Sequence, residues 1–237
     1  MWSQTLLGKY IIDKESDQIS DEINSVPGVN ILQLGALRGT KWLNLNRQSQ
    51  SYILDTRERC GAECALFSNF ESLPFQSESM DIVILRHTLE ATSKPQEVLH
   101  EAERVLSPDG YIVISGFNPF SLFGVMRLAE KYAVSDSWEG KSISIGRIKD
   151  WFAVLGLDLV VEKKIRLSHK VIKKEYGASF EFLGDLADYS LSVSSGVYVL
   201  MARKRTIPLS LRPSKWLNKS KNIATPIQAS PKVNGRS

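Results

Sequence analysis

The chain has 237 residues, of which 43% are hydrophobic and 24% are charged, and its formal net charge at pH 7 is +4. These values are ordinary for a soluble globular protein and leave room for one substantial domain. No apolar run approaches the roughly 18 residues that a membrane-spanning helix needs, and charge appears too early for a secretory signal, so we expect a cytoplasmic protein.

The amino-terminal part of the chain changes from a helical to an extended pattern. Apolar residues at loosely helical spacing predict a leading helix over residues 2–25, with a break in it as an alternative. Short apolar segments then predict strands at residues 30–35 and 52–55 and a third, brief strand at residues 65–68. The second of these strands ends on a carboxylate, Asp55.

The middle of the chain carries the strongest pattern. The continuous apolar run at residues 81–85 predicts a strand that is covered on both faces. Residues 95–106 have an apolar stripe at helical spacing, and Ser93 is a candidate cap for that helix. An Asp109-Gly110 turn leads into a further strand at residues 111–115. This order predicts a parallel βαβ unit, whose loops at the carboxyl ends of the strands bind ligands.

The remaining elements continue the alternation. Helices are predicted at residues 120–132 and 145–155, and strands at residues 157–163 and 193–202. Alternating strands and helices predict an α/β fold with a doubly wound, mainly parallel Rossmann-like sheet and flanking helices. The less regular interval at residues 166–191 is a candidate lid over the ligand crevice.

The positive charge lies at the carboxyl terminus. From Arg203 onward the chain has nine Lys and Arg and no acid, which leaves the preceding residues with a net charge near −5. This composition predicts a disordered basic tail at residues 206–237, behind a domain at residues 1–205. The tail is either a solvated extension or a polycation that contacts nucleic acid or an anionic membrane, and Trp216 slightly favours such a contact.

The two cysteines, Cys60 and Cys64, have the spacing of half a zinc site, and no histidine lies near them in the sequence. We therefore expect reduced thiols without a chemical role, and no metal site.

A glycine-bearing turn follows the first predicted strand. Gly35 and Gly39 lie where the chain leaves that strand, and such a turn lets a ligand approach the backbone. Asp55 lies twenty positions beyond Gly35, which is about the spacing at which a carboxylate accepts hydrogen bonds from ribose hydroxyls. Together these residues predict a nucleotide site.

Four sequence pieces extend this prediction to a family. They are Leu73-Pro74-Phe75 followed by Ser79-Met80-Asp81, Glu103-Arg104-Val105-Leu106, Val113-Ile114-Ser115-Gly116-Phe117-Asn118-Pro119, and Ala202-Arg203-Lys204-Arg205-Thr206-Ile207-Pro208. Through them the chain resembles the class I, Rossmann-like S-adenosylmethionine-dependent methyltransferases of the type 11 group, and an uncharacterised bacterial branch within it. The resemblance covers roughly residues 6–207 and implies a methyltransferase-like sheet.

The resemblance also implies an S-adenosylmethionine site. Asp55 matches the acid that binds ribose, Asn69 matches the acid that accepts from the adenine amino group, and Gln33 matches the acid that positions the methionine part. The other expected cofactor-binding residues are Gly35, Ala36, Gly39 and Phe70. Gln33 and Leu37 depart from the family pattern, because Gln33 lacks the acid's charge and Leu37 replaces a glycine that allows close approach.

The acceptor side is less specific. His87, just past the strand at residues 81–85, is a weak candidate general base, with a loop histidine as the alternative. We interpret Glu90 as the start of a helix rather than as a partner of His87. Phe117 and Asn118 are candidates for an acceptor pocket, while residues 120–123 are equally consistent with the core face of a helix.

Two hypotheses follow. The preferred one is a methyltransferase that acts on an unidentified acceptor. The alternative, motivated by Gln33 and Leu37, is a catalytically degenerate protein that binds nucleic acid, a membrane surface or a protein through its basic tail. A nicotinamide dehydrogenase is less consistent, because the Leu-Pro-Phe element resembles methyltransferases instead.

Overall fold

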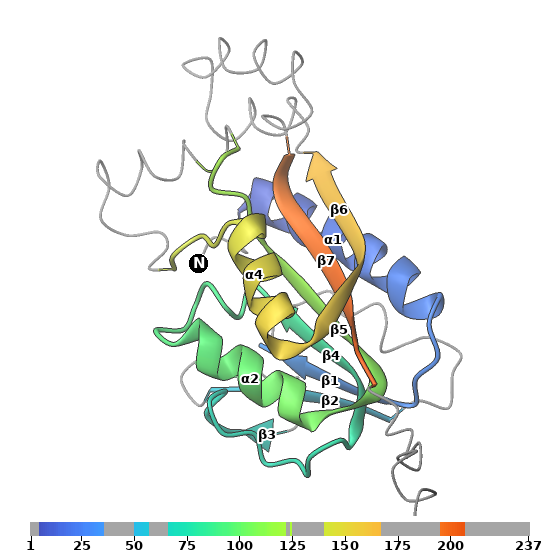
Figure 1. Cartoon of the computed structure of the whole chain (residues 1–237). Coiled ribbons are helices and arrows are strands. Elements are labelled where there is room, and N and C mark those ends of the chain that lie inside the picture. Colours follow the sequence, from blue (N-terminus) through green and yellow to red (C-terminus); the bar gives the residue numbers. More distant parts are fainter. Residues whose placement is uncertain are drawn as a thin grey trace, which may run out of the picture. The chain divides into compact units, whose positions relative to one another are not determined.

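A computed structural model of the chain describes residues 5–35, 50–56, 66–121, 124, 140–166 and 195–206 (Figure 1). The chain divides into two units, Met1–Thr206 and Ile207–Ser237, and the second lies wholly outside the described residues. Several predictions fall on the parts that are not described: Ala36, Leu37 and Gly39, the two cysteines, most of the helix at residues 120–132, the candidate lid and the basic tail.

The described strands form one seven-stranded sheet in the order β3-β2-β1-β4-β5-β7-β6 (Figure 1). Their bounds are β1 Asn30–Leu34, β2 Gln50–Asp55, β3 Leu66–Phe67, β4 Met80–Arg86, β5 Leu106–Phe117, β6 Leu157–Arg166 and β7 Ser195–Lys204. The pairs from β3 through β5 are parallel, whereas β7 is antiparallel to both β5 and β6. The predicted doubly wound, mainly parallel Rossmann-like sheet is confirmed.

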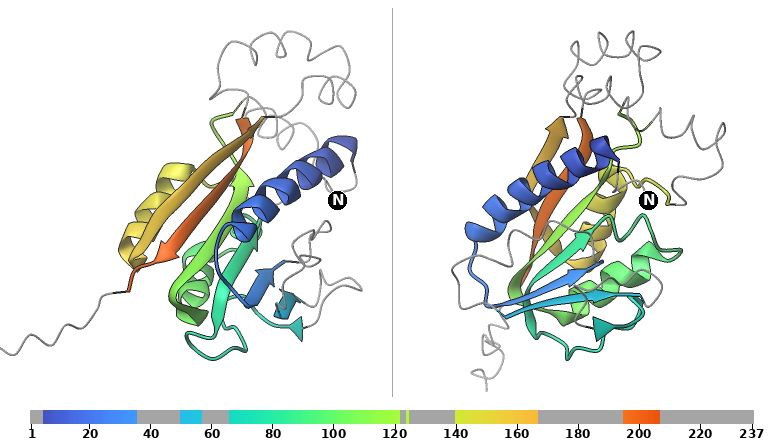
Figure 2. Two further views of the ribbon diagram at one scale, coloured as in Figure 1. Left: turned by 90° about the vertical axis from the view of Figure 1, so that its right-hand side faces the viewer. Right: turned by 180° about the vertical axis from the view of Figure 1, so that it is seen from behind.

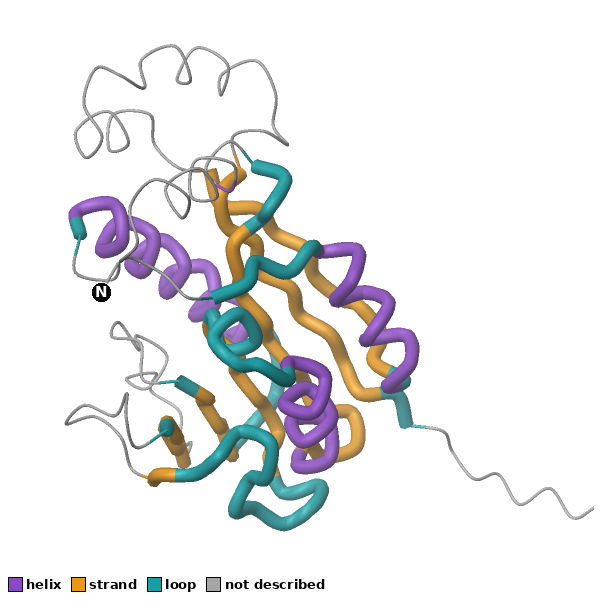
Figure 3. The backbone as a smooth tube through the Cα atoms, turned by 90° about the vertical axis from the view of Figure 1, so that its left-hand side faces the viewer, coloured by secondary structure: helices purple, strands orange, loops and turns teal. Residues whose placement is uncertain are grey.

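Among the described residues, three helices cover the two faces of this sheet. They are α1 Leu6–Asn24, α2 Pro95–Val105 and α4 Ile145–Leu155. Figures 2 and 3 show α1 on one face of the sheet, and α2 with α4 on the other. Among the described helices, none is long and apolar enough to cross a membrane.

The helix ends follow ordinary capping rules at two of the three helices. The Thr5 hydroxyl accepts from the Gly8 N–H at the start of α1, which runs without the break considered above. Helix α4 ends at Gly156, whose φ of 69° is the left-handed conformation that glycine adopts without strain. The predicted Ser93 cap of α2 is wrong, because the residue at that position is Lys94, which makes no capping bond with its side chain.

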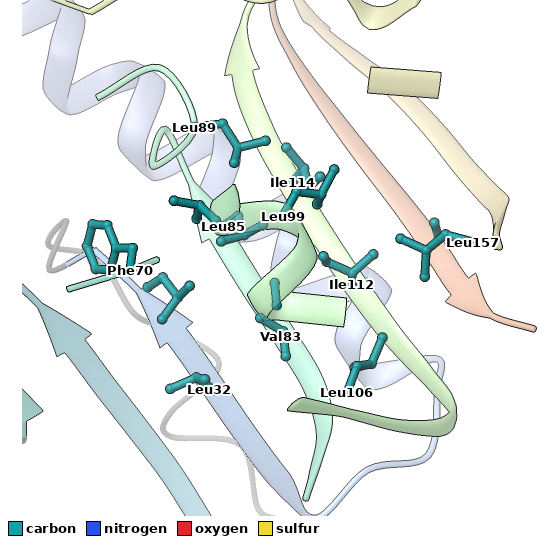
Figure 4. Close-up of a cluster of buried hydrophobic side chains, with 14 of the residues drawn as sticks. Leu32, Phe70, Val83, Leu85, Leu89, Leu99, Leu106, Ile112, Ile114 and Leu157 are labelled. Atoms are coloured by element: carbon teal, nitrogen blue, oxygen red, sulfur yellow. The ribbon is translucent and has the colours of Figure 1, made fainter. Parts of the chain in front are cut away.

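Both faces of the central strand β4 are buried, which explains its continuous apolar run. Val83 and Leu85 belong to the cluster beneath α2 and α4, which also holds Leu32, Leu99, Ile112 and Ile114 (Figure 4). Ile82 and Ile84 point to the other face, where they pack with Ile19 and Ile23 of α1. The sheet is therefore held from both sides, and its strand ends are fixed relative to one another.

Two carboxylates, Asp81 and Glu101, join separate elements of the fold. Asp81 accepts hydrogen bonds from the N–H groups of Val29 and Asn30 at 2.8 and 3.0 Å, which joins the entries of β1 and β4. Burial alone would raise the pKa of Asp81, but these backbone donors hold it below the ordinary value. Glu101 of α2 accepts from the Leu73 N–H at 3.1 Å.

Candidate functional site

Parallel pairing brings the ends of the central strands to one edge of the sheet. Leu34 is in register with Leu54 on one side and with Leu85 on the other, and Leu85 is in register with Ile114. The residues that follow these strands therefore lie along the carboxyl edge, where open α/β sheets bind ligands. Gly35, Asp55, His87 and Phe117 all belong to this edge; we call its two halves the β1–β2 end and the β4–β5 end.

The turn after β1 has the features of a ligand loop. Gly35 has a φ of 93°, a backbone conformation that residues other than glycine rarely adopt. Its N–H donates to the Leu54 carbonyl at 2.8 Å. Gln33 is 0% exposed, and its Nε2 donates to the Gly35 carbonyl at 2.7 Å. This bond fixes the orientation of the amide, and Gln33 Oε1 is left buried without a hydrogen-bond partner among the described residues.

The next strand adds a carboxylate. Asp55 is buried at the end of β2, and its Oδ1 accepts from the Thr56 N–H at 2.7 Å. Asn69 is exposed just beyond β3, and Phe70 is buried in the core cluster beneath α2 (Figure 4). The described residues of the expected cofactor site thus all follow, or belong to, the three adjacent strands β1, β2 and β3.

A cluster of four buried charges occupies the β4–β5 end. Glu15 of α1, Arg86, His87 and Glu90 are each at most 2% exposed, and we call them the buried charge cluster. Glu15 Oε2 lies 3.2 Å from Arg86 Nε and 3.4 Å from His87 Nε2. On the other side of the imidazole, His87 Nδ1 lies 2.9 Å from Glu90 Oε2. The imidazole therefore bridges two carboxylates.

The protonation states follow from this packing. Burial alone would lower the pKa of His87, but its attraction and hydrogen bonds to Glu15 and Glu90 outweigh burial and raise that pKa from 6.5 to about 9. Burial alone would raise the pKa of Glu15, but Arg86 and His87 lower it from 4.5 to about 2. The cluster therefore sets the two acidic side chains Glu15 and Glu90 against the two basic side chains Arg86 and His87.

These contacts change the interpretation of two residues. An imidazolium cannot accept a proton, so the geometry favours a structural role for His87 over the predicted role of general base. The interpretation of Glu90 as a helix start is wrong, because Glu90 lies in a turn before α2 and is a direct partner of His87. The nearby His87 ring offsets part of the cost of burying the Glu90 side chain.

The predicted acceptor-pocket residues are also buried. The ring of Phe117 packs on His87 with centroids 4.3 Å apart, at an angle of 38°. Asn118 is a turn residue, since its Oδ1 accepts from the Phe120 N–H at 3.1 Å and its Nδ2 donates to the Ser195 carbonyl. Phe120 is 78% exposed, which does not match the core-face alternative at that residue.

Sequence reasoning missed Glu15, Arg86 and Thr88. Glu15 interrupts the apolar stripe of α1 on its buried side, and Arg86 directly extends an apolar strand. A charge at an otherwise apolar position is the signal that could have paired them. Across the described residues, no group of three His, Cys, Asp or Glu side chains could hold a metal ion.

Comparisons with known proteins agree with this geometry. Residues 38–114 match the family model of the type 11 methyltransferase domain. The uncharacterised protein YafS of Escherichia coli strain K12 is 28% identical over 214 residues, which cover 90% of this chain and 84% of YafS.

Solved structures share the fold at lower identity. A SAM-dependent methyltransferase from Thermotoga maritima superposes with a TM-score of 0.60 at 15% identity, over 83% of this chain and 93% of its own. The cyclase SpnF superposes with a TM-score of 0.55 at 15% identity, over 82% of each chain. Fold alone therefore does not determine the reaction. The family match, the relative and the strand order together support a class I, Rossmann-like methyltransferase of type 11.

Proposed function

We propose that the protein binds S-adenosylmethionine at the β1–β2 end and transfers its methyl group to an acceptor held near the β4–β5 end. The observation that carries this proposal is the buried Oε1 of Gln33, which has no hydrogen-bond partner among the described residues and lies beside the left-handed turn at Gly35. A buried acceptor without a partner costs about 1–3 kcal/mol, so a ligand donor is its natural complement.

The residues present fit the cofactor's polar groups. Gln33 Oε1 can accept from an ammonium group, and the Asp55 carboxylate can accept from ribose hydroxyls. Gly35 has no side chain to keep a ligand from its backbone; a Cβ built there would lie 3.3 Å from Thr88 Oγ1. When bound, S-adenosylmethionine supplies an electrophilic methyl group on a sulfonium, and the duty of the protein is to orient the acceptor toward it.

Gln33 is a weaker partner than the acid it replaces. An amide oxygen offers a neutral hydrogen bond where a carboxylate offers a charge-assisted one, and the difference is about 1–2 kcal/mol, or roughly tenfold in affinity. We therefore propose moderate rather than tight binding of the cofactor. The degenerate-scaffold alternative is not favoured, because the family match at residues 38–114 includes Asp55 and Asn69, two of the expected cofactor-binding positions.

Calorimetric titration with S-adenosylmethionine and S-adenosylhomocysteine tests the proposal. Asp55→Asn keeps the size of the side chain and its bond from Thr56, and it should weaken binding about tenfold or more by removing one charge-assisted bond. Asp21→Asn, on an exposed position of α1, is the matched control and should bind as the wild type does. Absence of heat and of thermal shift at millimolar ligand, or equal binding by Asp55→Asn, would refute the proposed site.

A further inference from the structure

Residues 86–90, which we call the 86–90 turn, connect to several elements through consecutive side chains. Arg86 Nη2 donates to the Ile12 carbonyl at 2.8 Å and to Ser16 Oγ at 3.0 Å, both in α1. Thr88 Oγ1 donates to the Leu34 carbonyl at 2.6 Å, at the residue before Gly35. One side of the turn is therefore bonded to the backbone at the candidate cofactor loop.

The other side of the turn is bonded to the exit of β5. Glu90 Oε1 accepts from the Phe117 N–H at 2.8 Å, and the Glu90 carbonyl accepts from the Lys141 N–H at 3.0 Å. Nearby, Tyr198 of β7 donates its hydroxyl to the Ile143 carbonyl at 3.0 Å. The same five residues thus link the cofactor loop, the acceptor side and the segment that leads into α4.

His87 is at the centre of this arrangement. Its φ of 52° lies in the left-handed region, which costs a residue with a Cβ about 1 kcal/mol or more. The conformation is held by the His87 N–H bond to the Ser115 carbonyl at 3.1 Å and by the two carboxylates that flank the ring. If the ring were neutral, Glu15 and Glu90 would share the single cation of Arg86.

We propose that the 86–90 turn is the positioning element of the methyl-transfer site, and that His87, held between Glu15 and Glu90, keeps it in the shape that joins the Gly35 side to the Phe117 side. The inference rests on the proposed function, because the cofactor loop it steadies is the proposed S-adenosylmethionine site. In this scheme His87 and Glu90 are positioning residues that act through the backbone of Leu34 and Phe117.

The charges around His87 predict how the turn responds to pH. Glu15 faces the ring from α1, Arg86 and Glu90 face it from its own turn, and Tyr198 of β7 lies close enough to Glu90 to feel its charge. Burial, together with Glu90, holds the pKa of Tyr198 well above its ordinary value, so Tyr198 stays neutral while His87 titrates. Loss of the His87 proton therefore leaves a net negative buried charge, which weakens the turn.

The test combines two measurements on the full chain. The first is an NMR titration of the histidine rings, which is tractable because the chain has three histidines. The second is calorimetric binding of S-adenosylhomocysteine between about pH 7.5 and 10. The variants are His87→Gln, the charge-balanced double variant His87→Gln/Glu90→Gln, and His100→Gln on the exposed side of α2 as the matched control.

The double variant guards against a simple failure to fold. It keeps Glu15 opposite Arg86, restores a net charge of zero, and retains a side-chain oxygen to accept from the Phe117 N–H. Its own pH dependence also reports the ionisation of the ligand's amino group, which has to be subtracted from the wild-type curve.

The expected result is that wild-type and His100→Gln affinities fall with rising pH roughly five- to tenfold more than that of the double variant, as for a modest coupling between sites. The His87 ring should titrate near pH 9 in the same samples. Equal pH dependence in the wild type and the double variant would overturn the positioning role and leave the proposed function intact. No binding by the wild type at any pH, with a normal His87 titration, would instead refute the proposed function, and the coupling with it.

Discussion

The two ends of the carboxyl edge differ in how their buried polar groups are satisfied. At the β4–β5 end, the two acidic side chains Glu15 and Glu90 face the two basic side chains Arg86 and His87 at ion-pair distances of 2.9–3.4 Å. At the β1–β2 end, Gln33 is just as deeply buried, but its Oε1 has no partner among the described residues. The two ends lie on adjacent strands of the same sheet, so burial alone does not account for the difference.

This difference indicates that the β4–β5 end is structural framework and that the β1–β2 end is the binding site. A closed set of charges has little left to offer a ligand, and breaking it is costly, which suits a rigid support. A buried hydrogen-bond acceptor without a partner lowers the free energy of unfolding slightly, and a ligand that brings a donor restores the missing hydrogen bond. Substitutions at the β4–β5 end should therefore affect mainly folding, and substitutions at the β1–β2 end should affect mainly binding.

The largest effect is expected from Glu15→Gln. This change leaves Arg86 and His87 buried against Glu90 alone, and removal of one partner from a buried pair typically costs about 3–5 kcal/mol. Urea unfolding should show this loss, while Asp21→Asn, an exposed change on the same helix, should stay within about 0.5 kcal/mol of the wild type. A small loss of unfolding free energy for Glu15→Gln would mean that the buried charge cluster does not stabilise the fold.

The second effect is a dependence of stability on pH. The pKa of His87 is raised in the folded protein from 6.5 to about 9, so its contribution is fully present below pH 6.5 and is lost as pH rises through 9. We expect a loss of roughly 1–3 kcal/mol across this window. Unfolding free energies at several pH values check it, with the double variant His87→Gln/Glu90→Gln as the baseline. A flat difference between the two proteins would contradict the pairing.

The third effect tests how tightly the same end is packed. Gly116 of β5 is in register with Tyr198 of β7, and a Cβ at Gly116 would overlap the Tyr198 hydroxyl. Gly116→Ala should cost about 2 kcal/mol, because inserting a methyl group into a packed site forces its neighbours to move. Gly146→Ala is the control, since a Cβ in that position of α4 meets nothing within 4 Å and alanine favours a helix. Equal changes in melting temperature for the two variants would show that the side chains around Gly116 can move to accept a methyl group at little cost.

Local patterns predicted the framework well. The apolar run of β4 and the stripe of α2 depend on burial and periodicity, which neighbouring residues in the sequence reveal. The strand ends were placed within a few residues, for example β2 at Gln50–Asp55 against a predicted 52–55. Helix capping was less predictable, since Ser93 has the right residue type but the helix begins at Pro95, one position too late for it to cap.

The buried charge cluster was not predictable in the same way. Glu15 and Arg86 are 71 positions apart, and only the packing of α1 against the end of β4 brings them together. Without that contact His87 resembles an ordinary loop histidine with a free lone pair, and Glu90 resembles the first residue of a helix. Their roles depend on charge pairing between distant parts of the chain, which residue spacing within one segment cannot predict.

The smallest effect on stability, and the clearest effect on binding, is expected from Gln33→Leu. Leucine has a similar size, so the change removes the unpaired Oε1 together with the 2.7 Å bond from Nε2 to the Gly35 carbonyl, and the gain and the loss should nearly cancel, within about 1 kcal/mol. Affinity for S-adenosylhomocysteine should nevertheless fall about tenfold, because the acceptor for its ammonium group is gone. Gln18→Leu on α1 is the matched control and should leave that affinity unchanged. A Gln33→Leu protein that unfolds readily but binds normally would reverse the assignment of the two ends, because Gln33 would then be framework and the ligand would be held elsewhere.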